Sequence, residues 1–486
     1  MKKFTKHKTK SCNNNEQTSP TVLSPRSTPP PRPPPPNPMP VLPQELPPPS
    51  PPAIRTVLEL GPVKNLVFQG GSVKGTAYGG AVGGLHAAFA KNGMNFDAQI
   101  ENVAGTSAGA ITALALSLGT GVAELVDTIG NTDFKSFLDT KAYEIVSNIS
   151  NDSSSLPAKT SAAMNTLPLL NSSFGLASGQ NILDYLEAFV KLKTDINFLT
   201  FGELHTLVEE DRKLMKEGLR RSNLRKDLYV VAYNLTLDTP LVFNYKDTPD
   251  SVISDAVRCS MSIPYVFIPH KNFVKKDVDG DLVRIEASED LWIDGGITDN
   301  YPIWVFDKLL KAPYAATVGF YLVSSEEKRE IEQRGPIPSH SPDRREIKNI
   351  LDYTKAVIET VISSQQTSAH KQGKDIERTV YIDHLGTNMM NFGMTIEEKN
   401  NLVRSGWDCA CDRFGLGNEY VGQCKLEIKI KEEVVEKKKR KKGEMKLPEG
   451  GNGDGESKET VESSGTPSPD LDAGTDTAPM QKCVIV

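Results

Sequence analysis

The 486-residue sequence has few cysteines, and they are widely separated. None of the six forms a CxxC pair or a Cys and His spacing typical of zinc sites, so we expect reduced thiols, no metal and no cofactor. No window approaches the ~18 consecutive apolar residues of a membrane-spanning helix. The basic residues 1–8 are followed by no apolar run, so we expect neither a signal peptide nor a transmembrane segment.

An excess of positive charge is also missing. The chain has 56 Lys and Arg against 62 Asp and Glu, a net charge of −6, and this balance does not point to nucleic acid as a partner. Hydrophobic residues make up 38% of the chain and lie mostly between residues 54 and 430. That middle part is long enough to bury one large core.

Composition divides the chain into three parts. Residues 1–55 are rich in proline and polar side chains, and residues 427–486 are charged and rich in Gly, Ser and Thr, so we predict two disordered tails. Residues 56–426 form the predicted folded domain. Within this domain, residues 147–180 are rich in Ser and Asn and have weak apolar periodicity, which favours an insertion that acts as a lid.

The proline-rich tail permits two interpretations. Its proline density favours polyproline II, which suits a spacer. Arg32 beside several PxxP frames also resembles a ligand for SH3-type domains, so an SH3-type partner is the alternative.

The chain is organised around Gly-Thr-Ser-Ala-Gly at residues 105–109. An apolar run at residues 100–104 predicts a strand, and residues 108–118 predict a helix. This is the setting of a nucleophile elbow, in which Ser107 is exposed on a sharp turn above a helix N-terminus. The alternative is a glycine-rich turn without chemistry.

Two further glycine motifs lie at strand ends. Residues 64–69 predict a buried strand that leads into Gly70-Gly-Ser-Val-Lys-Gly75, whose backbone N–H groups suit an anion. A nucleotide phosphate loop is excluded, because its lysine must follow the last glycine. Asp294 follows a predicted strand and precedes Gly295 and Gly296, where α/β enzymes place catalytic groups.

Other patterns predict the rest of the domain. We expect paired strands at residues 228–236 and 240–244, strands at 315–323 and 379–382, and helices at 76–91, 251–261, 345–366 and 396–411. Four glycines inside the helix at 76–91 suggest close packing against the sheet. The acidic run around Asp279 and Gly280 favours a hairpin turn over a calcium loop, because Leu282 occupies the position that needs glycine.

The three motifs, in this order, resemble the signature blocks of the patatin-like phospholipases. The similarity extends through residues 200–204 and 259–267 to residues 395–404, so it covers roughly residues 57–413 and neither tail. The resemblance implies an α/β fold of three layers, α/β/α, and a metal-free Ser-Asp dyad that hydrolyses acyl esters of membrane phospholipids.

The resemblance also implies a role for each motif residue. Ser107 is the nucleophile and Asp294 its base; Gly70, Gly71, Ser72, Val73, Lys74 and Gly75 form the oxyanion loop; Gly105, Thr106, Ala108 and Gly109 form the elbow; Gly295 and Gly296 complete the Asp-Gly-Gly motif. Ser72 departs from the family pattern, which has a third glycine there. We expect serine to fit if its φ angle stays negative. Lys74 either steadies the loop or contacts a lipid phosphate.

Two other functions compete with this interpretation. A Ser-Asp-His esterase would need a histidine base, for which His384, at a predicted strand end, is the best-placed candidate. A lipid-binding or membrane scaffold protein on a hydrolase fold would need no base at all. The intact Ser107 and Asp294 argue against the scaffold.

The C-terminal tail carries two predicted membrane signals, of which the terminal cysteine has a chance occurrence as its alternative. Residues 437–442 are Lys-Lys-Lys-Arg-Lys-Lys, and the sequence ends with Cys483-Val-Ile-Val, which resembles a CaaX prenylation box. Prenylation is eukaryotic, whereas the core resembles bacterial effector phospholipases. We therefore expect a secreted bacterial effector that acts in the host cytosol and at host membranes, with a host protein as a candidate activator. A nuclear localisation signal is the alternative for the basic run.

We predict that Cys483→Ser, made in a Ser107→Ala background, shifts the protein from membranes to cytosol in eukaryotic cells. One lipid chain alone binds membranes marginally, and basic residues add at most ~1 kcal/mol each, so neutralising residues 437–442 should have a partial effect. Fractionation and mass spectrometry of Cys483 measure this. An unchanged membrane fraction with no prenyl mass would refute it.

Overall fold

The computed structural model describes residues 58–150, 171–220, 222–334 and 375–429, with residues 356 and 360. Residues 1–55, residues 430–486 of the predicted C-terminal tail, residues 151–170 of the predicted lid and nearly all of the helix expected at 345–366 lie outside these ranges. Residues 427–429, predicted to begin the disordered tail, are instead described, and Ile428 is buried against Gly130 of the folded domain. Among the described residues, no helix combines the length and apolar character needed to span a bilayer.

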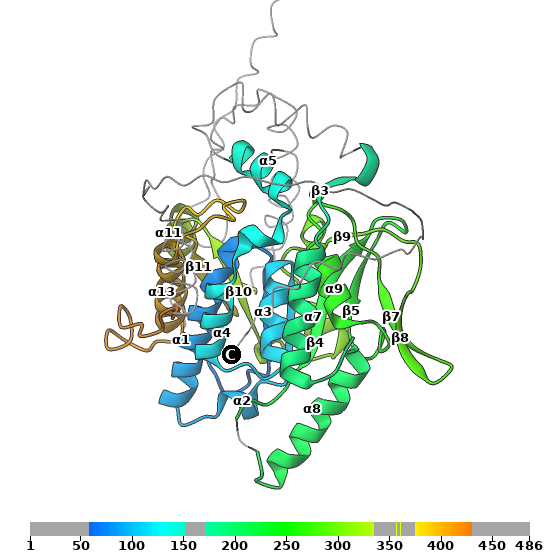
Figure 1. The fold of residues 1–486 in the computed structure, drawn as a ribbon. Coiled ribbons are helices and arrows are strands. Elements are labelled where there is room, and N and C mark those ends of the chain that lie inside the picture. The colour runs from blue at the N-terminus through cyan, green and yellow to red at the C-terminus, as the bar shows by residue number, and fades with distance from the viewer. Residues whose placement is uncertain are drawn as a thin grey trace, which may run out of the picture.

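A seven-stranded sheet forms the centre of the fold, with the order β11-β10-β1-β2-β4-β5 and with β9 also paired to β4 (Figure 1). Its strands are β1 (Asn65–Phe68), β2 (Asn102–Thr106), β4 (Asp227–Asn234), β5 (Thr239–Phe243), β9 (Trp292–Asp294), β10 (Thr317–Val323) and β11 (Thr379–Asp383). β1, β2, β4, β10 and β11 are parallel, whereas β5 and β9 run antiparallel to β4. The five parallel strands therefore end at one edge, the carboxyl edge of the sheet.

Helices cover both faces of the sheet. They are α1 (Ala77–Lys91), α2 (Phe96–Gln99), α3 (Ala108–Ser117), α4 (Val122–Asn131), α5 (Thr140–Ser150), α7 (Gln180–Thr194), α8 (Phe201–Lys216), α9 (Ile253–Ser260), α10 (Val305–Leu309), α11 (Ser325–Arg334) and α13 (Ile396–Arg413). Two short pairs, β3 (Gly175–Ala177) with β6 (Tyr265–Phe267) and β7 (Phe273–Val278) with β8 (Asp281–Glu286), flank the main sheet.

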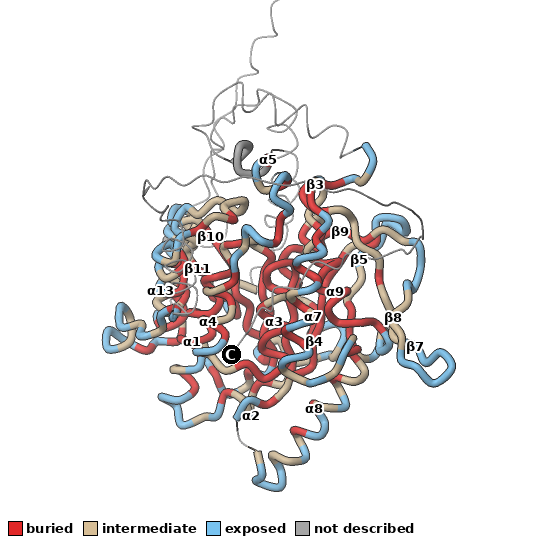
Figure 2. The backbone as a smooth tube through the Cα atoms, viewed as in Figure 1, coloured by how far each residue is buried: buried red, intermediate tan, exposed pale blue. Residues whose placement is uncertain are grey.

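The core consists of two apolar layers, one on each side of the sheet. Figure 2 shows that the buried residues are concentrated in the strands and in the helices beside them. Along β1, Leu66 and Phe68 pack with α1, α3 and α13, whereas Val67 packs with Val305 and Phe306 of α10. This alternation is what a strand buried on both faces requires, since successive side chains point to opposite sides. The predicted three-layer α/β/α fold is confirmed.

Most predicted elements are present within two or three residues of their expected ends. The strand pair at 228–236 and 240–244 is the antiparallel pair β4 and β5. The turn at Asp279 and Gly280 joins β7 to β8, so the hairpin interpretation is confirmed.

The prediction that the glycines of α1 pack against the sheet is wrong. A Cβ atom at Gly80 would lie 1.7 Å from the carbonyl oxygen of Val403, and one at Gly84 would lie 2.9 Å from that of Trp407. Both contacts are made to α13, while Gly79 faces Val126 of α4. The glycines therefore bring two helix backbones together, and the sequence pattern did not reveal which element lay opposite.

We predict that Gly80→Ala lowers the free energy of unfolding by ~2–3 kcal/mol, because the new methyl group clashes with the backbone of α13. Alanine is the better helix former by ~1 kcal/mol, so the clash must exceed that gain. Urea unfolding measures the change. Gly61→Ala is the matched control, since a Cβ there meets no atom within 4 Å; an equal loss in both variants would contradict the packing argument.

Candidate active site

Ser107 lies on a sharp turn between β2 and α3, with φ 53° and ψ −123°. The turn leaves no room for side chains beside it. A Cβ atom at Gly105 would lie 2.2 Å from the carbonyl oxygen of Gly109, and one at Gly109 would lie 2.3 Å from that of Phe68. The two glycines are thus required by close backbone contacts, and the predicted elbow geometry is present.

A second serine, Ser260 on α9, stabilises this turn by hydrogen bonding. Its hydroxyl accepts a hydrogen bond from the N–H of Ser107 (2.8 Å) and donates one to the carbonyl oxygen of Val231 (2.6 Å). Ser260 is fully buried. Sequence reasoning did not assign it a role, although it lies in the segment 259–267 that contributed to the family resemblance.

Asp294 ends β9 and is 5% exposed. Its Oδ1 accepts a hydrogen bond from the N–H of Gly296 (2.7 Å), and its carboxyl group also accepts one from the Ser107 hydroxyl. Burial raises the pKa of Asp294 to about 7, and the two hydrogen bonds oppose that rise. The structure therefore brings the two predicted residues into direct contact.

The Asp-Gly-Gly motif is fixed by its neighbours. β9 pairs with β4 so that Asp294 lies opposite Ala232, and a Cβ at Gly295 would lie 2.4 Å from the carbonyl oxygen of Val231. The N–H of Asp294 donates to the carbonyl oxygen of Ser262 (2.9 Å). A side chain at position 295 would push Asp294 away from Ser107.

The glycine-rich loop at residues 70–75 crosses directly over the turn. A Cβ at Gly70 would lie 3.2 Å from the Cβ of Ser107, and one at Gly75 would lie 3.0 Å from that of Ala108. The N–H of Gly70 donates to the carbonyl oxygen of Asn300, and the Asn300 side chain donates back to the Gly70 oxygen. Asn300 thus holds the loop in place, a role that the sequence did not indicate.

The expectation of a negative φ angle at Ser72 is wrong. Ser72 has a φ of 51°, in the left-handed region that favours glycine. Such a conformation costs a serine of order 1 kcal/mol. The loop therefore has a backbone conformation that suits glycine at this position, and the serine side chain makes that conformation strained.

His384 lies away from the contact between Ser107 and Asp294. It follows β11, which β10 and β1 separate from the strand that carries Ser107. Burial and the nearby charge of Lys74 lower the pKa of His384 to about 4, so the imidazole is neutral at physiological pH. The charge of Lys74, in the loop at residues 70–75, consequently lies near His384.

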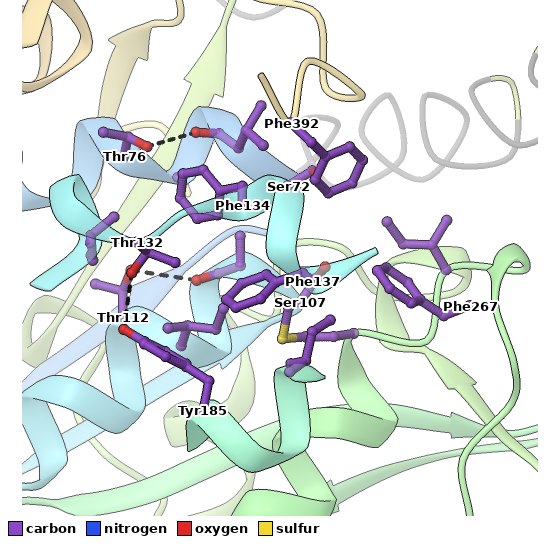
Figure 3. Close-up of a pocket in the computed structure, with 18 residues that line it drawn as sticks. Ser72, Thr76, Ser107, Thr112, Thr132, Phe134, Phe137, Tyr185, Phe267 and Phe392 are labelled. Carbon is purple, nitrogen blue, oxygen red and sulfur yellow. Dashed lines mark hydrogen bonds between the residues drawn. The ribbon is translucent and has the colours of Figure 1, made fainter. Parts of the chain in front are cut away.

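An apolar pocket opens beside Ser107 (Figure 3). Its empty space, which includes the open mouth, is about 650 Å³. The side chains that line it are mostly aliphatic and aromatic, and they are contributed by α3, α4, α7, β6 and neighbouring loops: Ile111, Ile129, Phe134, Phe137, Ile182, Tyr185, Met261, Ile263, Phe267 and Phe392. At one point the Tyr185 hydroxyl lies 3.0 Å from that of Thr132.

A buried arginine connects the pocket wall to Asp294. Arg258 on α9 is 1% exposed and donates to the Ser262 hydroxyl (2.6 Å) and to the carbonyl oxygens of Ser178 and Ile268. Ser262 in turn accepts the N–H of Asp294 through its carbonyl oxygen. Arg258 therefore fixes the segment between α9 and β6. Among the described residues, no group of acidic, His or Cys side chains is suited to hold a metal ion.

The chain is similar to known proteins over the region that holds this site. Residues 66–307 match the family model described as Patatin-like phospholipase. Protein R571 of Acanthamoeba polyphaga mimivirus, which is uncharacterised, is 24% identical over 345 residues, which span 71% of this chain and 91% of the viral protein. Probable lipid hydrolase 463L of Invertebrate iridescent virus 6 is 27% identical over 240 residues, 49% of this chain and 62% of that protein.

Among solved structures, VipD from Legionella pneumophila aligns with a TM-score of 0.41 and 19% identity. The alignment covers 78% of this chain and 74% of VipD.

We predict that Asp294→Asn makes the protein increasingly more stable than the wild type as pH rises from about 4 to 7. Because the folded pKa of about 7 exceeds the unfolded value of 3.8, the stability that Asp294 contributes is full below pH 3.8 and is lost as pH rises through 7. Asparagine stays neutral and avoids this loss, which is on the order of 1.4 kcal/mol per pH unit. Urea unfolding at pH 5 and pH 8 measures it.

Asp281→Asn, on the exposed strand β8, is the control for the loss of one carboxyl group. A difference between Asp294→Asn and wild type that stays constant from pH 5 to pH 8 would contradict a raised pKa at Asp294.

Proposed function

Because the chain belongs to the patatin-like phospholipase family, we propose that it hydrolyses acyl esters of phospholipids with Ser107 as the nucleophile and Asp294 as its base. The observation that carries the proposal is the direct hydrogen bond from the Ser107 hydroxyl to the buried Asp294 carboxyl group. A nucleophile in contact with its base is the minimal arrangement for acyl transfer. The similar viral protein 463L is named a probable lipid hydrolase, which agrees with this reaction class.

The proposed reaction has two halves. In the first, ionised Asp294 takes the Ser107 proton while the Ser107 oxygen attacks the ester carbonyl carbon, and the protonated Asp294 then gives that proton to the departing alcohol. In the second, Asp294 activates a water molecule that releases the fatty acid from Ser107. The same carboxyl group thus acts first as base and then as acid in each half.

The oxyanion of each tetrahedral intermediate needs preorganised donors. We place it beside the loop at residues 70–75, which lies against both Ser107 and Ala108. The N–H groups of Gly71 and Ser72 are the proposed donors, since that of Gly70 is bonded to Asn300. The loss of one such donor typically costs ~3 kcal/mol of transition-state stabilisation.

The apolar pocket supplies the proposed acyl-chain site. It begins at Ser107 and continues between Ile111, Phe137 and Phe267. An acyl chain buried there gains ~0.8 kcal/mol for each CH₂ group removed from water. Binding of the chain in this pocket would hold the ester carbonyl beside Ser107.

We predict that Ser107→Ala and Asp294→Asn each reduce fatty-acid release from mixed phospholipid vesicles by at least ~10³-fold. Nucleophile and base act as one unit, so the double variant should be no less active than either single variant. Released fatty acid and lysolipid, measured with and without eukaryotic cell extract, are the readouts. The arm with extract also tests for a host activator.

His384→Ala is the control that separates the dyad from a triad. Since His384 lies beyond β10 and β1, we expect this variant to keep most of the wild-type activity. An inactive His384→Ala with a normal melting curve would replace the dyad by a Ser-Asp-His triad. Binding of vesicles without hydrolysis by the wild type, under every condition, would favour a lipid-binding scaffold.

We further propose that the protein acts as a secreted bacterial effector at the membranes of a host cell. The proposal is supported only by the basic run at 437–442 and the Cys483 motif, which both lie outside the described residues. An SH3-type partner of residues 1–55 and the lid function of residues 147–180 likewise stay predictions from the sequence.

A further inference from the structure

Three segments around the mouth of the pocket share an unusual composition. Residues 171–183, 259–269 and 384–396 contain no Asp, Glu, Lys or Arg, although 24% of the chain is charged. The first and second segments carry β3 and β6, which pair with each other, and the third connects β11 to α13. We call these three segments the charge-free rim.

Each segment of the rim contributes side chains to the pocket. Ile182 comes from the first segment, Phe267 from the second and Phe392 from the third, and all three are at most 6% exposed. Phe267 and Phe392 flank the pocket in Figure 3. The rim and the pocket wall are therefore built from the same stretches of chain.

Each segment also presents one large apolar side chain to solvent. Phe174 is 59% exposed, Tyr265 is 47% exposed and Leu385 is 49% exposed. Tyr265 pairs with Gly175, so Phe174 and Tyr265 are neighbours on the β3–β6 ladder. Aromatic side chains with one apolar body and one polar end favour the boundary between lipid and water.

The backbone at these positions is strained. Phe174, Tyr265 and Leu385 have φ angles of 62°, 67° and 53°, in the left-handed region that bulky residues rarely adopt. Such conformations cost of order 1–3 kcal/mol each, persist only where the surrounding structure holds them, and cluster at functional sites. Glycine would be the less strained residue at all three positions, yet each holds an exposed apolar side chain.

We propose that the charge-free rim is a membrane-contact surface through which the protein sits on a zwitterionic phospholipid bilayer, with Phe174, Tyr265 and Leu385 entering its interface. This inference rests on the proposed function, because it gives the lipid a path from the bilayer into the pocket.

The three segments carry no charged side chain of their own, and charged side chains of both signs contact them from neighbouring segments. Asp139 accepts a hydrogen bond from the Ser178 N–H. Lys135 lies beside Gly393. A surface without excess charge favours neutral headgroups, and contact through apolar burial resists salt.

The test uses the full-length chain carrying Ser107→Ala and vesicles of phosphatidylcholine alone, at high salt so that the basic run at 437–442 is screened. The double variant Phe174→Gly with Tyr265→Gly should bind these vesicles at least about tenfold more weakly in co-sedimentation. Its melting temperature should be retained or raised, because glycine relieves the positive φ angles. Leu385→Gly should weaken binding in the same way.

Leu219→Gly is the matched control. Leu219 is 72% exposed but follows α8, at the opposite end of the molecule from β3 (Figure 1). The Leu219→Gly variant should bind vesicles as tightly as the Ser107→Ala protein from which it is made. Equal loss in Leu219→Gly and the rim variants, or no loss in the rim variants, would overturn the proposal. If the rim variants bind vesicles normally and lose only stimulation by cell extract, the rim contacts a protein and the membrane assignment is wrong.

A soluble ester separates this inference from the proposed function. With Ser107 intact, the rim variants should hydrolyse 4-nitrophenyl butyrate at the wild-type rate but hydrolyse vesicle phospholipid about tenfold more slowly. Full activity of Ser107→Ala on the soluble ester would reject the catalytic proposal and leave the vesicle-binding result intact. Loss of soluble-ester activity in the rim variants would show that they disturb the pocket, and would overturn the assignment of the rim to membrane contact.

Discussion

At the carboxyl edge of the sheet, close backbone contacts and one buried hydroxyl group hold the turn at Ser107 in place. Gly109 lies against the end of β1, Gly105 lies against Gly109, and Ser260 fills the gap toward β4. Nothing here depends on an ion pair, whose strength would vary with salt. Steric contact fixes the position of the serine, and the loop at residues 70–75 is built over it.

In the proposed dyad, the same close packing would take over the role of a histidine beside Ser107. An exposed aspartate has a pKa near 3.9 and is too weak a base to activate a hydroxyl group at neutral pH, whereas histidine has a pKa near 6.5. Burial gives Asp294 a pKa of about 7, which is the basicity of an ordinary imidazole. In the proposed mechanism, desolvation of Asp294 would supply the basicity that a triad obtains from a histidine side chain.

The sequence predicted the parts of the site that are encoded locally. Glycines around Ser107 and after Asp294 indicated sharp turns at strand ends, and parallel strands bring such ends together. It did not predict Ser260, Asn300 or Arg258, because each acts on a segment far away in the chain. A buried serine or arginine has no local pattern that distinguishes it from an exposed one, so only the three-dimensional structure reveals its partners.

The two wrong predictions, for the glycines of α1 and for the φ angle of Ser72, also depended on distant parts of the chain. Four glycines in α1 correctly indicated a close contact, but helix periodicity describes one helix and says nothing about what lies opposite. At Ser72 a steric rule gave the expected sign of φ, and the surrounding loop overrode it. The predicted α/β layers were right because strand and helix periodicities are properties of each segment alone.

The segment that follows the family match is part of the same folding unit. The match ends at residue 307, yet β10 lies beside β1 in the middle of the sheet, and α13 covers the glycine face of α1. Ile428, later still, fills the space above Gly130 on α4. A fragment that ends at residue 307 would expose the backbone N–H and C=O groups of β1 that pair with β10. It would also expose the glycine face of α1 that α13 covers. Exposed strand edges promote aggregation. The family model therefore matches a shorter stretch of chain than the folded domain contains.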